Sequence, residues 1–63
     1  MAKYLFPLYS CIARAENMPR LLVVGRVFDQ DTQKRKYIVI DSDGVRDWED
    51  ADVMEANFII VED

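Results

Sequence analysis

Apolar and polar side chains alternate along the first part of the chain, which predicts β-strands. In "KYLFPLYSCIA" (3–13), alternation places Tyr4, Phe6 and Leu8 on one face. Pro7 has no N–H to donate, so this strand is expected at a sheet edge or with a bulge. In "RLLVVGRVFD" (20–29), four consecutive apolar residues are typical of a central strand. Gly25 then predicts a bulge or a close backbone approach.

The next segment predicts a hairpin and a turn. "QDTQKRK" (30–36) is polar and is expected to be a loop, and "YIVID" (37–41) the partner strand. "SDG" (42–44) predicts a tight turn, because Gly44 tolerates positive φ and the side chain of Asp43 can bond to the nearby backbone. Two antiparallel strands followed by a turn are therefore expected over 20–44.

The acidic stretch that follows has the spacing of a helix. Trp48, Ala51, Met54 and Phe58 are three, three and four residues apart, which places them on one helix face. Asp47 is a suitable N-cap. Asn57 can adopt the left-handed conformation that ends a helix, and "FIIV" (58–61) predicts a last strand.

Together these segments predict one compact α+β domain over residues 1–63. It would hold a small antiparallel sheet of three to five strands and one short helix, in the order β-β-β-α-β. The helix would bury Trp48 and Met54 against Val23, Val39 and Ile60. An SH3-like five-stranded barrel is the alternative, with 48–54 as a strand or a single turn.

The composition argues against catalysis and against a bound metal or cofactor. The chain has no His and a single Cys, so the commonest general base and metal ligand are missing. Asp41 and Asp43 match the first ligand positions of a calcium loop, but Val45 and Arg46 break the pattern. We therefore expect a non-enzyme without a cofactor. The lone Cys11 fits a reducing cytoplasm, and no apolar run is long enough to span a membrane.

Charge is distributed very unevenly. The formal net charge is −4, made up of +4 over residues 1–40 and −8 over residues 41–63, where Arg46 is the one basic residue. We expect a contact surface for a partner among these carboxylates: Asp41, Asp43, Asp47, Glu49, Asp50, Asp52 and Glu55. Glu62 and Asp63 extend the acidic stretch. Rigidly held carboxylates can present a phosphate-like field to Lys and Arg side chains that would otherwise hold DNA.

The charged half, "DSDGVRDWEDADVMEANFIIVED", resembles that of small phage-encoded anti-CRISPR proteins that act as DNA mimics. The resemblance covers size, composition and charge layout. It implies an inhibitor without enzyme activity or cofactor, acting in the host cytoplasm. It also implies a partner with a basic DNA-recognition groove, such as the subunit of a type I surveillance complex that reads the protospacer-adjacent motif. Arg46 would then be a local tether or a specificity contact.

Other functions remain open at this point. An acidic surface can simply keep a protein in solution. An SH3-like interaction module within a larger assembly is the second candidate, with Tyr4, Tyr9, Tyr37 and Trp48 forming a peptide groove. Exposure of Trp48 distinguishes the two, because a buried Trp48 excludes that groove. The identity of the partner stays open, as does the choice between a monomer and a weak homodimer.

Overall fold

A computed structural model describes residues 3–61 as one five-stranded antiparallel sheet with one short helix. The elements are β1 (Cys11–Ala13), β2 (Leu21–Asp29), β3 (Lys34–Ile40), β4 (Arg46–Asp50), α1 (Ala51–Asn57) and β5 (Ile59–Ile60). The strands lie in the order β4-β3-β2-β1-β5, so the sheet is open rather than closed into a barrel. The predicted α+β class is confirmed, with one more strand than the predicted order contained.

The β2–β3 hairpin forms the centre of the sheet, as its apolar sequence predicts. Val23 pairs with Val39, and the register shifts before Gly25, which pairs with Ile38. This irregularity confirms the predicted bulge. A Cβ on Gly25 would lie 2.9 Å from Ile38 Cδ1, so the absent side chain leaves room for its cross-strand neighbour.

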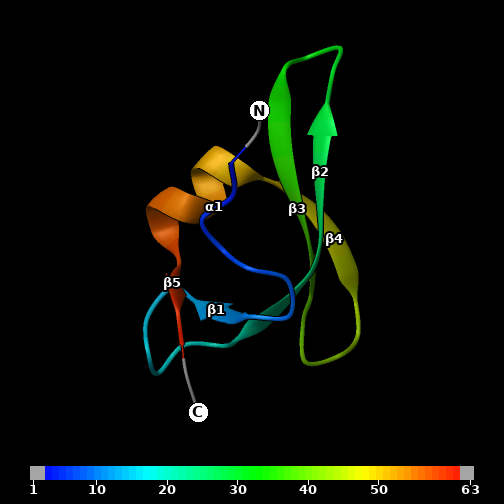
Figure 1. The fold of residues 1–63 in the computed structure, drawn as a ribbon. Coiled ribbons are helices and arrows are strands. Elements are labelled where there is room, and N and C mark those ends of the chain that lie inside the picture. Colours follow the sequence, from blue (N-terminus) through cyan, green and yellow to red (C-terminus); the bar gives the residue numbers. More distant parts are fainter. Residues whose placement is uncertain (1–2, 62–63) are drawn as a thin grey trace.

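One face of the sheet carries the core. Helix α1 and the N-terminal segment lie on that side in Figure 1, and the other side of β2, β3 and β4 has no covering element among residues 3–61. Tyr37 is at the centre of the core, with the rings of Tyr4 and Phe6 5.5 and 5.4 Å from its own. The buried core residues are Phe6, Ile12, Val23, Tyr37, Val39, Ala51 and Met54.

The predicted start of the helix is wrong by three residues. Residues 46–50 form β4, which pairs with β3 along its whole length, and the N-cap is Asp50 instead of Asp47. Trp48 is therefore on a strand and is 59% exposed. The spacing that placed Trp48 on a helix face does not reflect a helix here. The backbone of residues 46–50 forms its hydrogen bonds with β3 instead. Met54 is buried as predicted, whereas Ile60 is exposed.

The predicted first strand is confirmed only at its end. Residues 4–10 form no strand, and Tyr9 has a φ of 68°. Tyr4 and Phe6 still point into the core, as alternation predicts. The backbone N–H of Phe6 donates to the Tyr37 hydroxyl at 3.0 Å, which replaces a strand partner.

The C-terminal part follows the prediction more closely. α1 ends at Asn57, although not through a left-handed residue: Phe58 is extended, and its N–H donates to the Met54 carbonyl at 2.9 Å. β5 follows and pairs with β1. Glu62 and Asp63 lie outside the described residues. No helix over residues 3–61 is long and apolar enough to cross a membrane.

Candidate functional site

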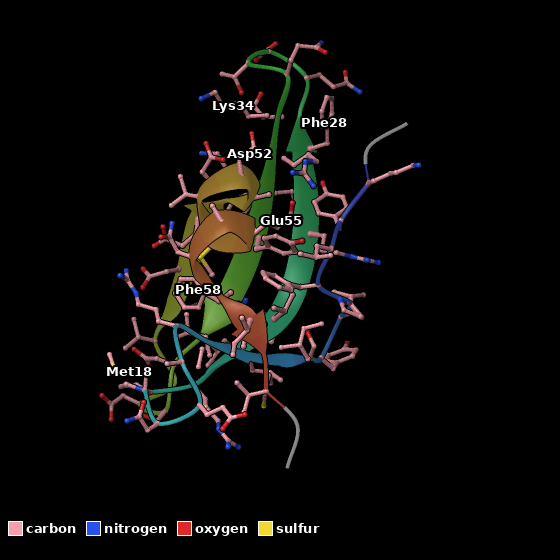
Figure 2. All side chains as sticks on the ribbon, turned by 90° about the vertical axis from the view of Figure 1, so that its left-hand side faces the viewer. Met18, Phe28, Lys34, Asp52, Glu55 and Phe58 are labelled. Atoms are coloured by element: carbon pink, nitrogen blue, oxygen red, sulfur yellow. The ribbon has the colours of Figure 1, made fainter. Side chains whose placement is uncertain are left out.

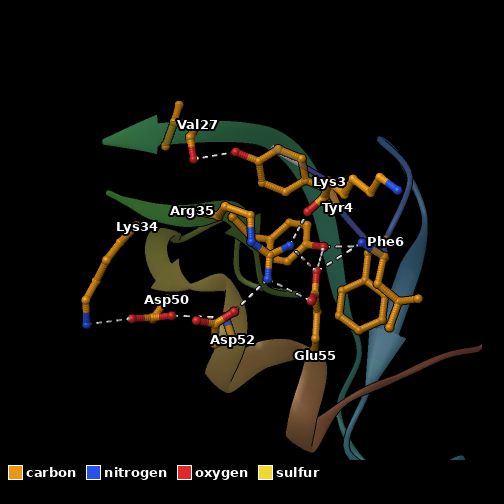
Figure 3. A network of polar contacts seen from close by, with 11 residues as sticks. Lys3, Tyr4, Phe6, Val27, Lys34, Arg35, Asp50, Asp52 and Glu55 are labelled. Atoms are coloured by element: carbon orange, nitrogen blue, oxygen red, sulfur yellow. Dashed lines mark hydrogen bonds and ion pairs between the residues drawn. The ribbon is translucent and has the colours of Figure 1, made fainter. Parts of the chain in front are cut away.

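Glu55 is the centre of a polar network that joins the helix, the sheet and the N-terminal segment. Its Oε2 accepts hydrogen bonds from the Tyr37 hydroxyl at 2.5 Å, from Arg35 Nη1 at 3.0 Å and from the Leu5 backbone N–H at 3.0 Å. Its Oε1 accepts from Arg35 Nη2 at 3.0 Å. Figure 3 shows these contacts converging on one carboxylate. Glu55 therefore holds the fold together and has little capacity left for a partner.

Arg35 also contacts a second carboxylate and the N-terminal segment. Its Nη2 lies 2.6 Å from Asp52 Oδ1, and its Nη1 donates to the Lys3 carbonyl. The guanidinium lies over the ring of Tyr4, 5.5 Å from its centroid. Figure 2 looks onto α1, with Asp52 and Glu55 along it. Asp52 is consequently matched by an intramolecular cation, although its side chain is 83% exposed.

The network moves the pKa values of its members apart. Burial by itself would raise the pKa of Glu55, but hydrogen bonds from Arg35, Tyr37 and the Leu5 N–H outweigh burial and lower this pKa from 4.5 to about 2. Burial, and then the hydrogen bond to Glu55, raise the pKa of Tyr37 to about 12. Hydrogen bonds to Glu55 and then to Asp52 raise the pKa of Arg35. Glu55 thus stays ionised and Tyr37 stays neutral across the physiological range.

Asp50 serves the helix start. Its Oδ1 accepts from the Asp52 backbone N–H at 3.0 Å, and its Oδ2 lies 3.7 Å from Lys34 Nζ. A side-chain acceptor at this position satisfies one of the unpaired N–H groups in the first helical turn. Three of the seven predicted contact residues, Asp50, Asp52 and Glu55, therefore form ion pairs within the chain.

Asp41 and Asp43 lie in the turn between β3 and β4. Asp41 Oδ1 accepts from the backbone N–H groups of Asp43 and Val45, both at 2.9 Å. Gly44 has a φ of 82°, which confirms the predicted turn. The acceptor is Asp41, however, and not Asp43 as predicted. The second oxygen of Asp41 and the exposed carboxylate of Asp43 have no ion pair among residues 3–61.

Asp47 and Glu49 are the two predicted residues that point together toward the helix side. On β4 they pair with Val39 and Tyr37, whose side chains enter the core. Cross-strand partners share a face, so both carboxylates lie above the helix-side surface of the sheet. Both side chains are exposed, and neither has an ion pair with another described residue.

A hollow of about 230 Å³ lies beside these two carboxylates. We call it the acidic hollow. It is lined by Arg14, Leu21, Val39, Asp41, Val45, Asp47, Glu49, Val53, Met54, Asn57 and Phe58. Three carboxylates thus stand at the rim of an apolar floor. The Arg14 guanidinium lies 5.4 Å above the Phe58 ring, so this cation stacks on the aromatic wall.

The sequence did not indicate the apolar part of this hollow. Arg14, Leu21, Val53 and Phe58 come from four separate segments, and no local pattern connects them. The inward position of Arg35 could have been predicted, because alternation in "KRKY" places this residue on the same face as Tyr37. In the structure Arg35 forms ion pairs within the chain and does not contribute to the proposed contact surface.

The predicted aromatic groove does not form. Tyr37 is fully buried, and Tyr4 packs against it with its hydroxyl donating to the Val27 carbonyl at 2.7 Å. Tyr9 is exposed in the N-terminal segment, away from β4. Trp48 is exposed as the groove requires, but it borders a different hollow, lined also by Val27, Phe28, Asp29 and Lys36.

Comparison of the chain with protein-family models, with curated proteins and with solved structures finds no match. No group of three His, Cys, Asp or Glu side chains among residues 3–61 is arranged to hold a metal ion.

Proposed function

We propose that this protein is a small cytoplasmic inhibitor that binds the cationic, DNA-contacting surface of a host defence complex. This is the anti-CRISPR activity that the charged half of the sequence resembles, directed at a type I surveillance complex. The contact surface is Asp41, Asp43, Asp47 and Glu49. One observation carries the proposal: Asp47 and Glu49 point to the same side, beside an apolar hollow, without an ion pair among the described residues.

The hollow is suited to an arginine or lysine side chain of the partner. Such side chains have an apolar stem and a charged end, and they bury the stem while the charge stays at a polar rim. The stem would lie on Leu21, Val39 and Met54, and the charged group would reach Asp47 and Glu49. Arginine is favoured, because its planar fork binds carboxylates in bidentate fashion.

The carboxylates replace phosphates only approximately. Side chains two residues apart on a strand are separated by roughly 6.6 Å, whereas one DNA strand places a charge every ~3.4 Å along the axis. The β4 pair therefore offers about half the linear charge density of a DNA strand. The turn residues Asp41 and Asp43 continue the acidic edge from β4. The protein would act by occupying the partner's DNA site, without chemistry of its own.

Charge reversal at the rim tests the proposal. The protein, the double variant Asp47→Lys/Glu49→Lys and a control Glu16→Lys/Asp31→Lys are each immobilised and exposed to lysate of bacteria that carry a type I surveillance complex. Both variants change the net charge by the same amount, and the control residues are exposed and do not line the hollow. The protein and the control should retain the complex, and the β4 variant should not.

Two further readouts complete this experiment. A salt gradient should release the complex, since screening weakens surface charge pairs, and added duplex carrying the protospacer-adjacent motif should compete with capture. Circular dichroism confirms that each variant is folded. Equal capture by the β4 variant and the control would contradict the proposal.

A protein-interaction module is the second candidate. One observation supports it, namely that Trp48 is 59% exposed. The open sheet and the burial of Tyr37 remove the SH3-like groove in its expected form. What remains is an apolar surface around Trp48 on the side of the sheet opposite to the helix.

A further inference from the structure

The side of the sheet away from α1 has an apolar centre, although no described element covers it. An antiparallel sheet with one packed face usually places polar residues on the other. Here the opposite face, which we call the outer face, has an apolar centre of Leu22, Val27, Ile38, Ile40 and Trp48. The first four are half-buried by their neighbours alone, and Trp48 is exposed. Charged residues border this centre: Asp29, Lys34, Lys36, Arg46 and Asp50. The outer face thus has an apolar centre and a charged border, which is the usual composition of a protein interface.

We propose that a second copy of this chain covers the outer face, forming a two-fold dimer in which two sheets pack face to face. Each partner contributes ~800 Å² of accessible surface to a standard protein interface. A molecule that extends 35 × 21 × 16 Å would need most of one broad side for such an interface. A domain of this size also gains the most from association, because it buries little surface alone.

Charge complementarity favours a second copy and defines its orientation. On the outer face, Arg46 and Asp50 stand on β4, two residues to either side of Trp48. A two-fold axis that crosses the strands at the Ile38–Trp48 pair reverses the strand direction. It places Arg46 against Asp50 of the partner subunit, and this contact occurs twice.

The alternative two-fold arrangement is less favourable. An axis parallel to the strands places β4 over β2 of the partner subunit, which brings Asp50 over Val27 of the partner subunit and Arg46 over Leu22 of the partner subunit. Both charges would then be desolvated against apolar side chains without a compensating pair, and Lys36 would lie over Lys36 of the partner subunit. The strand-reversing arrangement places only Lys36 over an apolar residue, Ile40 of the partner subunit. In the strand-reversing arrangement Asp50 keeps its bond to the Asp52 N–H and its pair with Lys34.

This dimer is independent of the proposed inhibitor surface. The acidic hollow lies on the helix side of the sheet, so both copies would present it to the outside. A dimer would therefore display two carboxylate surfaces, and a partner with repeated subunits could bind both, which raises overall affinity through effective concentration.

Sedimentation of the full chain over a range of concentrations tests the dimer. We expect conversion from the 7.4 kDa monomer to twice that mass. The emission of Trp48, the single tryptophan, should move to shorter wavelength over the same concentrations. Trp48→Lys should weaken the dimer at least about tenfold, because an aromatic residue central to an interface contributes strongly to it. Arg46→Glu should weaken it too, by placing like charges opposite Asp50 of the partner subunit.

Leu5→Lys is the matched control. Leu5 is 61% exposed, close to the 59% of Trp48, but it lies on the helix side, where its N–H donates to Glu55 of α1. This variant should dimerise like the unmodified chain. A monomer at millimolar concentration with unshifted Trp48 emission would overturn the proposal, as would a Trp48→Lys variant that dimerises normally. An unchanged Arg46→Glu dimer would overturn the strand-reversing orientation.

Discussion

At the scale of single residues, Glu55 shows that part of the acidic stretch stabilises the fold. A carboxylate that accepts hydrogen bonds from Arg35, Tyr37 and the Leu5 backbone is a structural residue. Its surroundings hold its pKa at about 2, below the ordinary 4.5. Sequence shows seven carboxylates that look alike, and only the contacts of each side chain separate those that stabilise the fold from those available to a partner.

Acid stability should depend on Glu55. The folded pKa is lower than the unfolded one, so the stabilising contribution is complete above about pH 4.5 and is lost as pH falls toward 2. Glu55→Gln should lower the free energy of unfolding at pH 7 by about 2 kcal/mol, because it leaves Arg35 without its main partner. It should also flatten the decline in stability between these pH values. Urea unfolding at pH 2.5, 4.5 and 7 measures both effects.

Glu49→Gln is the control for this measurement. Glu49 is exposed and has no side-chain ion pair with another residue of 3–61, so we expect a change within about 0.5 kcal/mol and the same loss of stability at low pH as in the unmodified chain. The network is not what stabilises the fold if Glu55→Gln behaves like this control.

At the scale of secondary-structure elements, the junction of β4 and α1 shows where sequence reasoning succeeds and fails. β2, β3, the turn at Gly44 and β5 were predictable, because each has a local signal in apolar runs or turn residues. β4 was not, since "RDWED" lacks alternating apolar residues. Its strand conformation comes from pairing with β3, which is a non-local interaction.

The position of the helix cap gives a direct test of this boundary. Asp50→Ala should lower the free energy of unfolding by about 1 kcal/mol, because the Asp52 N–H loses its acceptor. Asp47→Ala should change it by less than about 0.5 kcal/mol, since Asp47 is an exposed strand residue. Thermal unfolding followed by circular dichroism compares the two. A larger loss for Asp47→Ala would instead support a helix that begins at residue 48.

The candidate site was predictable in part for the same reason. The sequence indicated an acidic contact surface, and Asp47 and Glu49 do stand together on one side of β4. It could not reveal that Arg35 and Lys34 neutralise the helix carboxylates, because those pairs join residues far apart in the chain. Nor could it reveal the apolar floor of the acidic hollow.

At the scale of the whole molecule, the sheet separates two surfaces of different character. The helix side carries the core and, at its rim, the acidic hollow. The outer face has an apolar centre that is bordered by Lys34, Lys36, Arg46 and Asp50. Alternation within β4 produces this division, because neighbouring residues of a strand point to opposite sides. A short strand can therefore serve an anion surface and an apolar interface at once.

The central claim is that the acidic hollow binds a cationic side chain, and backbone NMR titration with a short arginine-containing peptide tests it most directly. The account predicts saturable amide shifts at Val39, Asp47, Glu49 and Val53, which Asp47→Lys/Glu49→Lys abolishes and Glu16→Lys/Asp31→Lys leaves intact. Shifts spread evenly over all exposed acidic residues, or retained in the β4 variant, would contradict it.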